Sequence, residues 1–323
     1  MANGGDDGAD SRGAARGSTV DVRLSVRPRR AAAGRVKWSA GTEPPKLAPV
    51  LAADCHHHIY NSRYAVDPRA TLRPEDATVE DYRALRRRLG MTRHVIVQPS
   101  TYGTDNSCTL DALAAFGPQA RGVPVVDTTV SDAELQRMDG LRVRGIRFNL
   151  AQAGATTPEM IEPLSLRVND LGWHIQVNAP AAKIMEIKDV FERVPTPIVF
   201  DHLAHIPQPG GIADPLFPAI IALIDKGKTW VKLSGAYADT KVGPPTYADT
   251  SAVARAYVKA APERLVWGSD WPHPSEKVKP DDALLLDWSP EETVRTRILT
   301  QNPEELYAFP KGRSEAAGSR IRG

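Results

Sequence analysis

The sequence between residues 50 and 267 repeats one pattern, in which a short apolar segment typical of a strand is followed by an amphipathic segment typical of a helix. Several helical segments end at a glycine, such as Gly90, Gly117 and Gly172, and glycine readily ends a helix. About eight such units predict a parallel sheet covered by helices and favour a closed (β/α)8 barrel over an open sheet. The predicted strands cover residues 50–58, 94–98, 122–126, 143–148, 173–178, 197–201, 229–233 and 264–267. No Gly-x-Gly-x-x-Gly or Walker loop follows any of them, which counts against a nucleotide-binding fold.

The two ends of the chain differ in composition from the centre. Residues 1–44 are rich in Gly, Ala and Arg and poor in large apolar side chains, which predicts a disordered tail. An alternative is that residues 20–24 add a short strand. Residues 311–323 predict a second disordered tail, so a single barrel domain is expected over residues 45–310.

The overall charge and the cysteine content exclude several classes of protein. Lys and Arg total 41 against 39 Asp and Glu, and the net charge of +2 gives no field that would attract nucleic acid or an anionic membrane. No apolar run approaches the roughly 18 residues of a membrane span, and residues 1–20 lack the apolar core of a secretory signal. Cys55 and Cys108 are too few for a disulfide framework. These features predict a soluble, cytoplasmic protein.

Two polar strand ends lie far apart in the sequence. The first strand ends Asp-Cys-His-His-His, and strict alternation would place His56 and His58 on one face and Cys55 and His57 on the other. The last strand leads into Gly-Ser-Asp-Trp-Pro-His, which carries Asp270. These side chains converge if the sheet closes, because the carboxyl ends of all strands then meet at one face, where the chemistry of such barrels takes place.

The other predicted strands also end in polar side chains, whereas apolar residues dominate earlier in each strand. The same face is therefore expected to collect further candidate site residues. They are Gln98, Ser100, Tyr102, Arg144, Arg147, Gln176, Asn178, Asp201, His202, His205, Ser234, Tyr237 and His273.

Five motifs in order carry a family resemblance over residues 45–309. They are Asp54–His58, Val97–Gly103, Arg144–Asn149, Asp201-His202 and Gly268–His273. With these motifs the chain resembles the amidohydrolase superfamily, in particular its amidohydrolase-2 branch and the group of pyrone-dicarboxylate and sugar-lactone enzymes.

The resemblance implies the opening of a carboxylated lactone, either a pyrone, a muconolactone or a sugar-acid lactone. Lactone hydrolysis needs an activated water and a polarised ester carbonyl. Asp270 is the candidate general base, and His56, His58 and His202 are the candidates that stabilise the negative charge on the carbonyl oxygen. An alternative is that His58 or His202 only orients Asp270.

Many members of the superfamily bind zinc, so the metal needs separate consideration. The strand-four end, Arg147-Phe148-Asn149, has no lysine for a carbamate bridge, and Gln176 stands where a ligand histidine is expected. Zinc prefers imidazole, thiolate and carboxylate. We therefore favour a site without metal, and the alternative is one Zn²⁺ on His56, His58, His202 and Asp270.

Substrate binding is expected to involve one of the two arginines of strand four. Arg144 and Arg147 lie three residues apart and so face opposite sides of an ideal strand, and Arg147 is nearer the rim. A guanidinium group suits a carboxylate. Residues 150–159 contain no Lys or Arg, which disfavours a doubly charged pyrone. The neutral candidates for substrate hydroxyls are Ser100, Tyr102, Ser234 and Tyr237, with Gln98, Gln176 and His273 beside them.

The sequence leaves three readings of the function. The first is a lactone hydrolase or isomerase, because the two reactions share the acyl-transfer step. The second is a zinc-dependent decarboxylase or amidohydrolase on the same barrel, and the third is a barrel that only binds a ligand. The expected partner is a small molecule, and the oligomeric state is open.

Overall fold

The computed structural model describes residues 49–152, 154–276 and 284–312. The predicted tail at 1–44, the alternative strand at 20–24 and most of the predicted tail at 311–323 lie outside these residues. Among the described residues, no helix is long and apolar enough to cross a bilayer.

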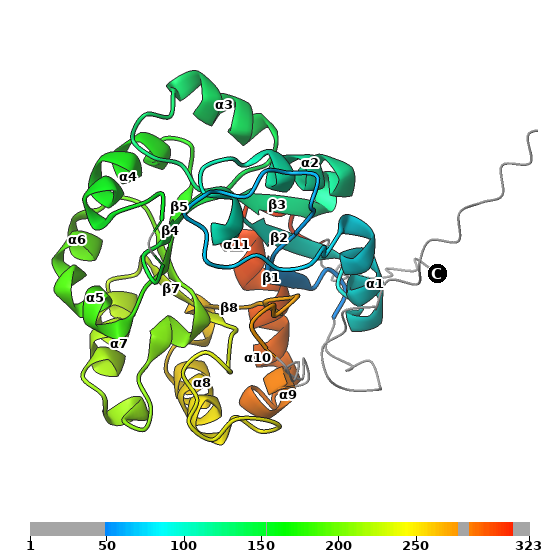
Figure 1. Ribbon diagram of the computed structural model, residues 1–323. Helices are drawn as coiled ribbons and strands as arrows, with labels where there is room; N and C mark the ends of the chain where they lie inside the picture. Colours follow the sequence, from blue (N-terminus) through cyan, green and yellow to red (C-terminus); the bar gives the residue numbers. More distant parts are fainter. Residues whose placement is uncertain (1–48, 153, 277–283, 313–323) are drawn as a thin grey trace, which may run out of the picture. The chain divides into compact units, whose positions relative to one another are not determined.

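Eight parallel strands form the centre of the described fold (Figure 1). They are β1 (Ala53–His57), β2 (Arg93–Val97), β3 (Ala120–Val123), β4 (Gly145–Asn149), β5 (His174–Asn178), β6 (Ile198–Phe200), β7 (Thr229–Leu233) and β8 (Leu265–Trp267). β1 to β3 pair in one sheet and β4 to β8 in a second. The backbone N of Arg144 donates to O of Gly122 at 3.0 Å and joins β4 to β3, and N of Asp270 donates to O of His56 at 2.7 Å and joins the β8 end to β1. The sheet closes on itself, which confirms the predicted (β/α)8 barrel.

The helices surround the ring of strands, except α11, which is seen near the centre of the view (Figure 1). They are α1 (Val79–Leu89), α2 (Ser107–Phe116), α3 (Asp132–Gly140), α4 (Ile161–Asn169), α5 (Ala181–Glu186), α6 (Lys188–Arg193), α7 (Leu216–Asp225), α8 (Ala248–Ala260), α9 (Leu284–Trp288), α10 (Glu292–Thr296) and α11 (Asn302–Leu306). Short 3-10 turns are η1 (Ser100–Tyr102), η2 (Gly117–Gln119), η3 (Pro158–Met160), η4 (His202–His205), η5 (Gly211–Ala213) and η6 (Pro262–Arg264), and η7 (Arg297–Gln301) is a π-helical turn.

Local sequence signals explain where α1 begins and ends. Thr78 and Asp81 form a capping box, in which each side chain accepts a hydrogen bond from the other residue's backbone N–H. Gly90 ends the helix at φ +70°, a left-handed conformation that glycine adopts without strain. Between these residues Tyr82, Leu85 and Leu89 form the buried face.

Some helical stretches of the chain are divided into shorter elements. Residues 181–193 form two helices, α5 and α6, which are separated at Ile187. After β8, α10, η7 and α11 follow one another directly, and Pro303 lies in the first turn of α11, where its missing N–H is tolerated.

Buried apolar side chains form two clusters. One contains Cys55, Val199, Trp230 and other strand residues together with Tyr307, and the larger one contains side chains between strands and helices. His57 lies on the face of β1 opposite Cys55, and the centroid of its ring is 3.5 Å from that of Tyr82 of α1. The predicted pairing of Cys55 and His57 on one face is therefore wrong, because the β1–β2 register shifts between Asp54 and His57 and breaks the alternation.

Candidate active site

Asp270 lies just beyond β8 at the carboxyl end of the barrel. Its backbone is left-handed, with φ +57°, a conformation that costs a residue other than glycine about 1–2 kcal/mol. Its carboxylate faces three imidazoles: Oδ1 lies 3.5 Å from Nε2 of His56 and 3.4 Å from Nε2 of His58, and Oδ2 lies 3.9 Å from Nε2 of His202. The hydroxyl of Tyr237 donates a hydrogen bond to Oδ2. The strained turn thus holds one carboxylate among four polar side chains.

The surroundings of Asp270 decide its charge. Burial alone would raise the pKa of this carboxyl, but the neighbouring His202, His58 and His56 outweigh burial and hold the pKa well below its usual range. Burial also lowers the pKa of His202 and, further, that of His56. Asp270 is therefore ionised at neutral pH, next to imidazoles that burial favours in the neutral form.

Each histidine is held through its second ring nitrogen. Nδ1 of His58 donates to the carbonyl O of Val97 at 2.8 Å, and Nδ1 of His202 lies 3.0 Å from Oγ of Ser234. Nδ1 of His56 lies 3.2 Å from Oδ1 of Asp201. All three rings consequently direct Nε2 toward Asp270.

Two glycines allow the backbone to approach these rings closely. A Cβ atom at Gly268 would lie 2.5 Å from Cβ of His56, and one at Gly235 would lie 2.6 Å from Nδ1 of His202. Gly235 also has φ +59°, which disfavours any other residue. No larger residue fits at either position without moving a site histidine.

A second group of charges lies within the barrel beside His56. Oδ2 of Asp201 accepts from Nε2 of Gln176 at 3.1 Å and lies 3.4 Å from a guanidinium N of Arg147. Nζ of Lys232 lies 3.5 Å from Oδ1 of Asp201, and the side chains of Lys232 and Asp201 are both 0% exposed. Burial would raise the pKa of Asp201, but His56, Lys232 and Arg147 hold it well below the usual range. The sequence reasoning missed Lys232, although a lysine within the otherwise apolar end of a predicted buried strand was a usable signal.

A cavity of about 320 Å³ opens above Asp270. Arg147, Ser100, Tyr237, His58 and His202 are among the candidate residues that line it. Asn178 and His205, also expected at this face, line it as well, and the polar lining residues that the sequence did not indicate are Asn149, Gln152, Ser275 and Glu276. The cavity thus combines one arginine with mostly neutral hydrogen-bonding groups among its described residues.

Two predicted binding residues point elsewhere. Arg144 precedes β4 and so lies at the opposite end of the barrel, where a guanidinium N is 3.0 Å from Oδ1 of Asp139 in α3. Gln98 is 0% exposed, and its amide donates to the carbonyl O of Asp105 at 2.8 Å while its Oε1 accepts from Thr109. The prediction that these two side chains contact the substrate is wrong, because both are committed to partners within the scaffold.

Four other candidates support the site without lining the cavity. Gln176 is 0% exposed and binds Asp201, and Ser234 contacts His202. The hydroxyl of Tyr102 accepts from the backbone N of Asn61 at 2.8 Å. The ring of His273 packs edge-on against that of Tyr237, with 5.5 Å between centroids. Direct substrate contacts are therefore not expected from Gln176, Ser234, Tyr102 or His273, which act on their neighbours instead.

Part of the site fits a metal ion. His56, His202 and Asp270 each offer one ligand atom, and these atoms lie within 4.8 Å of one another. Two imidazoles and a carboxylate are a suitable donor set for a divalent cation such as Zn²⁺. Gln176 does not contribute, because its amide is bound to Asp201 and Lys232.

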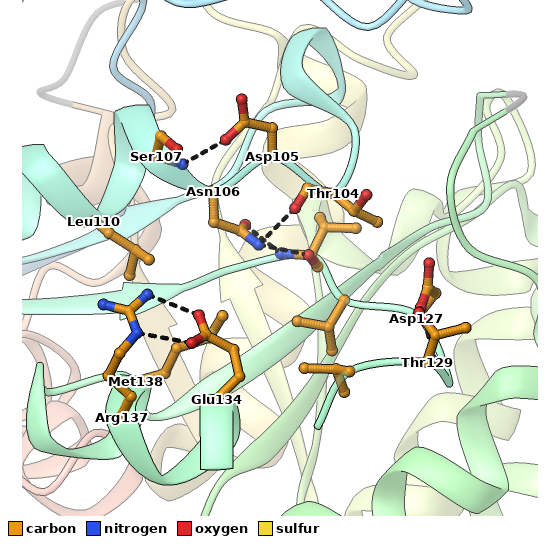
Figure 2. A pocket seen from close by; sticks show the side chains of 13 residues that line it. Thr104, Asp105, Asn106, Ser107, Leu110, Asp127, Thr129, Glu134, Arg137 and Met138 are labelled. Carbon is orange, nitrogen blue, oxygen red and sulfur yellow. Dashed lines mark hydrogen bonds and ion pairs between the residues drawn. The ribbon is translucent and has the colours of Figure 1, made fainter. Parts of the chain in front are cut away.

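A second cavity, of about 340 Å³, lies beside α2 and α3 (Figure 2). Two charged side chains on its wall pair with each other, since the guanidinium of Arg137 donates to Glu134 at 2.7 Å, while Asp105 and Asp127 accept from Ser107 and Thr129. Asn106 donates to the carbonyl O of Thr104 at 3.1 Å and of Val125 at 2.8 Å. None of the catalytic candidates lines this cavity.

Comparison with known proteins places this geometry in a family context. The sequence model of the amidohydrolase family, Amidohydro_2, matches residues 53–309. The chain is similar to a 2-pyrone-4,6-dicarboxylate hydrolase of Comamonas testosteroni, with 32% identity over 85% of this chain and 96% of that protein. It is also similar to a D-galactarolactone isomerase of Agrobacterium fabrum, with 31% identity over 84% of this chain and 96% of that protein. An apo crystal structure of a protein from Agrobacterium tumefaciens superimposes with a TM-score of 0.77 and 30% identity, covering 83% of this chain and 100% of that one.

Proposed function

The chain belongs to the amidohydrolase family, and from this premise we propose that it hydrolyses the ester bond of a carboxylated lactone. The observation that carries the proposal is the position of the Asp270 carboxylate, which lines a cavity and faces Nε2 of three histidines. The names of the similar hydrolase and isomerase, both of which denote lactone chemistry, support the substrate class.

Asp270 is the proposed general base. It accepts a proton from water as the water oxygen bonds to the lactone carbonyl carbon, and it returns that proton to the ring oxygen when the ring C–O bond breaks. The products are an alcohol and a carboxylic acid, which ionises, and Asp270 is again a carboxylate. A positioned base of this kind contributes roughly 10² to 10⁴ in rate.

The histidines stabilise the charge that develops on the carbonyl oxygen. His56 and His202 face the same space through Nε2, as two donors to an oxyanion require. His58 commits Nδ1 to Val97 and holds its Nε2 against Asp270. We assign His58, whose ring is fixed by Val97, to positioning Nε2 of His56, 3.3 Å away, beside the base.

Arg147 is the proposed partner of the substrate carboxylate. It lines the cavity, and its Nε is buried without a hydrogen-bond partner in the described structure. Its terminal nitrogens contact the carbonyl O of Gln98 and Asp201, so part of its charge is already balanced. Ser100, Asn149 and the other neutral lining groups suit hydroxyls. We infer a lactone with one carboxylate and several hydroxyls, as in a sugar acid.

A metal is the alternative for the same site. His56, His202 and Asp270, with His58 beside them, would hold a divalent cation, and such a cation polarises an ester carbonyl. We favour reaction without it, because Asp270 and the histidines already supply a base and donors for the oxyanion.

The first experiment follows acid release from pyrone, muconate and sugar-acid lactones, with and without chelator, for the wild type and Asp270→Asn. We expect turnover that survives chelation and falls about 10² to 10⁴-fold in Asp270→Asn. Loss of turnover with chelator and its recovery with zinc would establish the metal-dependent alternative. Full activity of Asp270→Asn would remove Asp270 as the base.

Isomerisation is a second candidate, favoured by the neutral groups that could hold substrate hydroxyls. In an isomerase a hydroxyl of the substrate attacks the carbonyl in place of water, and Asp270 takes its proton. Reaction in H₂¹⁸O separates the two: hydrolysis places one ¹⁸O in the product carboxylate, and direct isomerisation places none.

A further inference from the structure

Lys232 is a buried basic side chain that has no role in the proposed reaction. It lies in β7, and its side chain is 0% exposed. Its Nζ is 2.7 Å from Oε1 of Gln176, 3.3 Å from Nδ1 of His56 and 3.5 Å from Oδ1 of Asp201. An ammonium group has three N–H donors and no acceptor. Two of these donors therefore have a hydrogen-bond acceptor, one of which is a ring nitrogen of the active site, and Asp201 adds an ion pair at 3.5 Å.

The neighbouring groups are oriented consistently with this arrangement. Nε2 of Gln176 donates to Oδ2 of Asp201 at 3.1 Å, which turns Oε1 of Gln176 toward Lys232. Arg147 also contacts Oδ2 of Asp201, at 3.4 Å. Asp201 thus faces donor groups of Gln176, Arg147 and Lys232 in addition to the ring of His56.

The other side of His56 points to the same tautomer. Nδ1 of His58 donates to the carbonyl O of Val97, which can only accept, so a neutral His58 presents a lone pair at Nε2. Nε2 of His56 lies 3.3 Å from that atom. A hydrogen bond between the two requires a proton on Nε2 of His56, and its Nδ1 then carries the lone pair that faces Lys232.

We propose that Lys232 is a positioning residue that donates to Nδ1 of His56 and holds this histidine as the Nε2–H tautomer. His56 then presents a hydrogen-bond donor to the site. Oδ1 of Asp201, 3.2 Å from the same Nδ1, would select the opposite tautomer in the absence of Lys232, whose Nζ lies 3.3 Å from Nδ1 and 3.5 Å from Oδ1. That tautomer would present a lone pair at Nε2, the form in which an imidazole binds a metal.

The proposal rests on the proposed function for its chemical consequence, but the tautomer itself can be measured without turnover. In full-length protein labelled with ¹⁵N-histidine, long-range ¹⁵N–¹H correlations distinguish Nδ1–H from Nε2–H, and His56→Gln identifies the His56 signals. We expect Nε2–H in the wild type and in Lys228→Met, which changes an exposed lysine just before the same strand. We expect Nδ1–H in Lys232→Met. A wild-type His56 protonated at Nδ1 overturns the proposal, whether or not any lactone is turned over and whether or not Lys232→Met folds.

Zinc binding gives an independent readout. Titration calorimetry with zinc chloride should show tighter binding by Lys232→Met, because the change frees the lone pair at Nε2 and removes a neighbouring positive charge. Outer-shell partners of ligand histidines typically alter metal affinity by about 10- to 100-fold, which is the gain expected here. Lys228→Met should match the wild type. Equal zinc affinities in the wild type and in a folded Lys232→Met would contradict the proposal.

Discussion

Replacement of Gly235 by alanine tests whether the position of His202 controls turnover. The new Cβ would lie 2.6 Å from Nδ1 of His202, whereas ordinary van der Waals contact begins at 3.4 Å. The ring must therefore move by about 0.8 Å, the difference between these two distances, or the chain must shift by a similar amount. Either movement disturbs the 3.0 Å contact between His202 and Ser234.

The change has two separable costs. The left-handed φ of +59° costs alanine about 1–2 kcal/mol of folding stability. A displacement of about 1 Å in a positioned catalytic group can cost about 10²-fold in rate. We therefore expect Gly235→Ala to lower kcat on the best lactone by about this factor while the protein remains folded.

Gly227→Ala is the matched control, because Gly227 has φ +87° and an added Cβ there meets nothing within 4 Å. Both variants should lose similar stability in urea unfolding, and only Gly235→Ala should lose kcat. Equal kcat values for the two variants, or an equal loss in both, would refute the view that the contact with His202 limits the rate.

Three further predictions follow from the charges of the barrel. Asp201→Asn should lower the free energy of unfolding in urea by about 3–5 kcal/mol, because it leaves buried Arg147 and Lys232 without their carboxylate. An unchanged free energy of unfolding would show that these ion pairs do not stabilise the barrel. Arg147→Met should raise KM for a carboxylated lactone by about ten- to hundredfold and leave an uncharged lactone unaffected, while Arg144→Met, remote from the cavity, should change neither. Burial holds the pKa of His94 well below 6.5, so below pH 6.5 the unfolded chain binds a proton at this residue that the folded protein does not bind, and the free energy of unfolding falls with the pH. His94→Asn should make this decline shallower by about 1.4 kcal/mol per pH unit. An unchanged slope would show that His94 does not contribute to it.

The barrel was predictable because its signals are local and repeated. Helix ends such as Gly90 and the run of apolar strands define the units, and closure then brings His56, His58, His202 and Asp270 together. Their chemical roles remain proposals.

What the sequence did not reveal depends on register and on distant partners. The irregular pairing in β1 reverses the alternation, so Cys55 faces the interior strand cluster while His57 packs on Tyr82. Arg144 was placed at the wrong end because spacing alone does not locate the start of β4. A role for Lys232 could not be predicted from β7 alone, because its partners Asp201 and His56 come from other parts of the barrel.

The surroundings of the two buried carboxylates differ, and the difference supports Asp270 as the proposed base. Asp201 is 0% exposed, is absent from the cavity wall and faces Lys232, Arg147 and Gln176, so a water molecule in the cavity has no route to it. Asp270 is 6% exposed and lines the cavity, and its partners are imidazoles and Tyr237 rather than a lysine and an arginine. Protonation of Asp201 would leave Lys232 and Arg147 uncompensated in the barrel, whereas protonation of Asp270 leaves only hydrogen-bonding neighbours. Transient proton transfer is therefore far less costly at Asp270, which is the electrostatic reason to assign the base there.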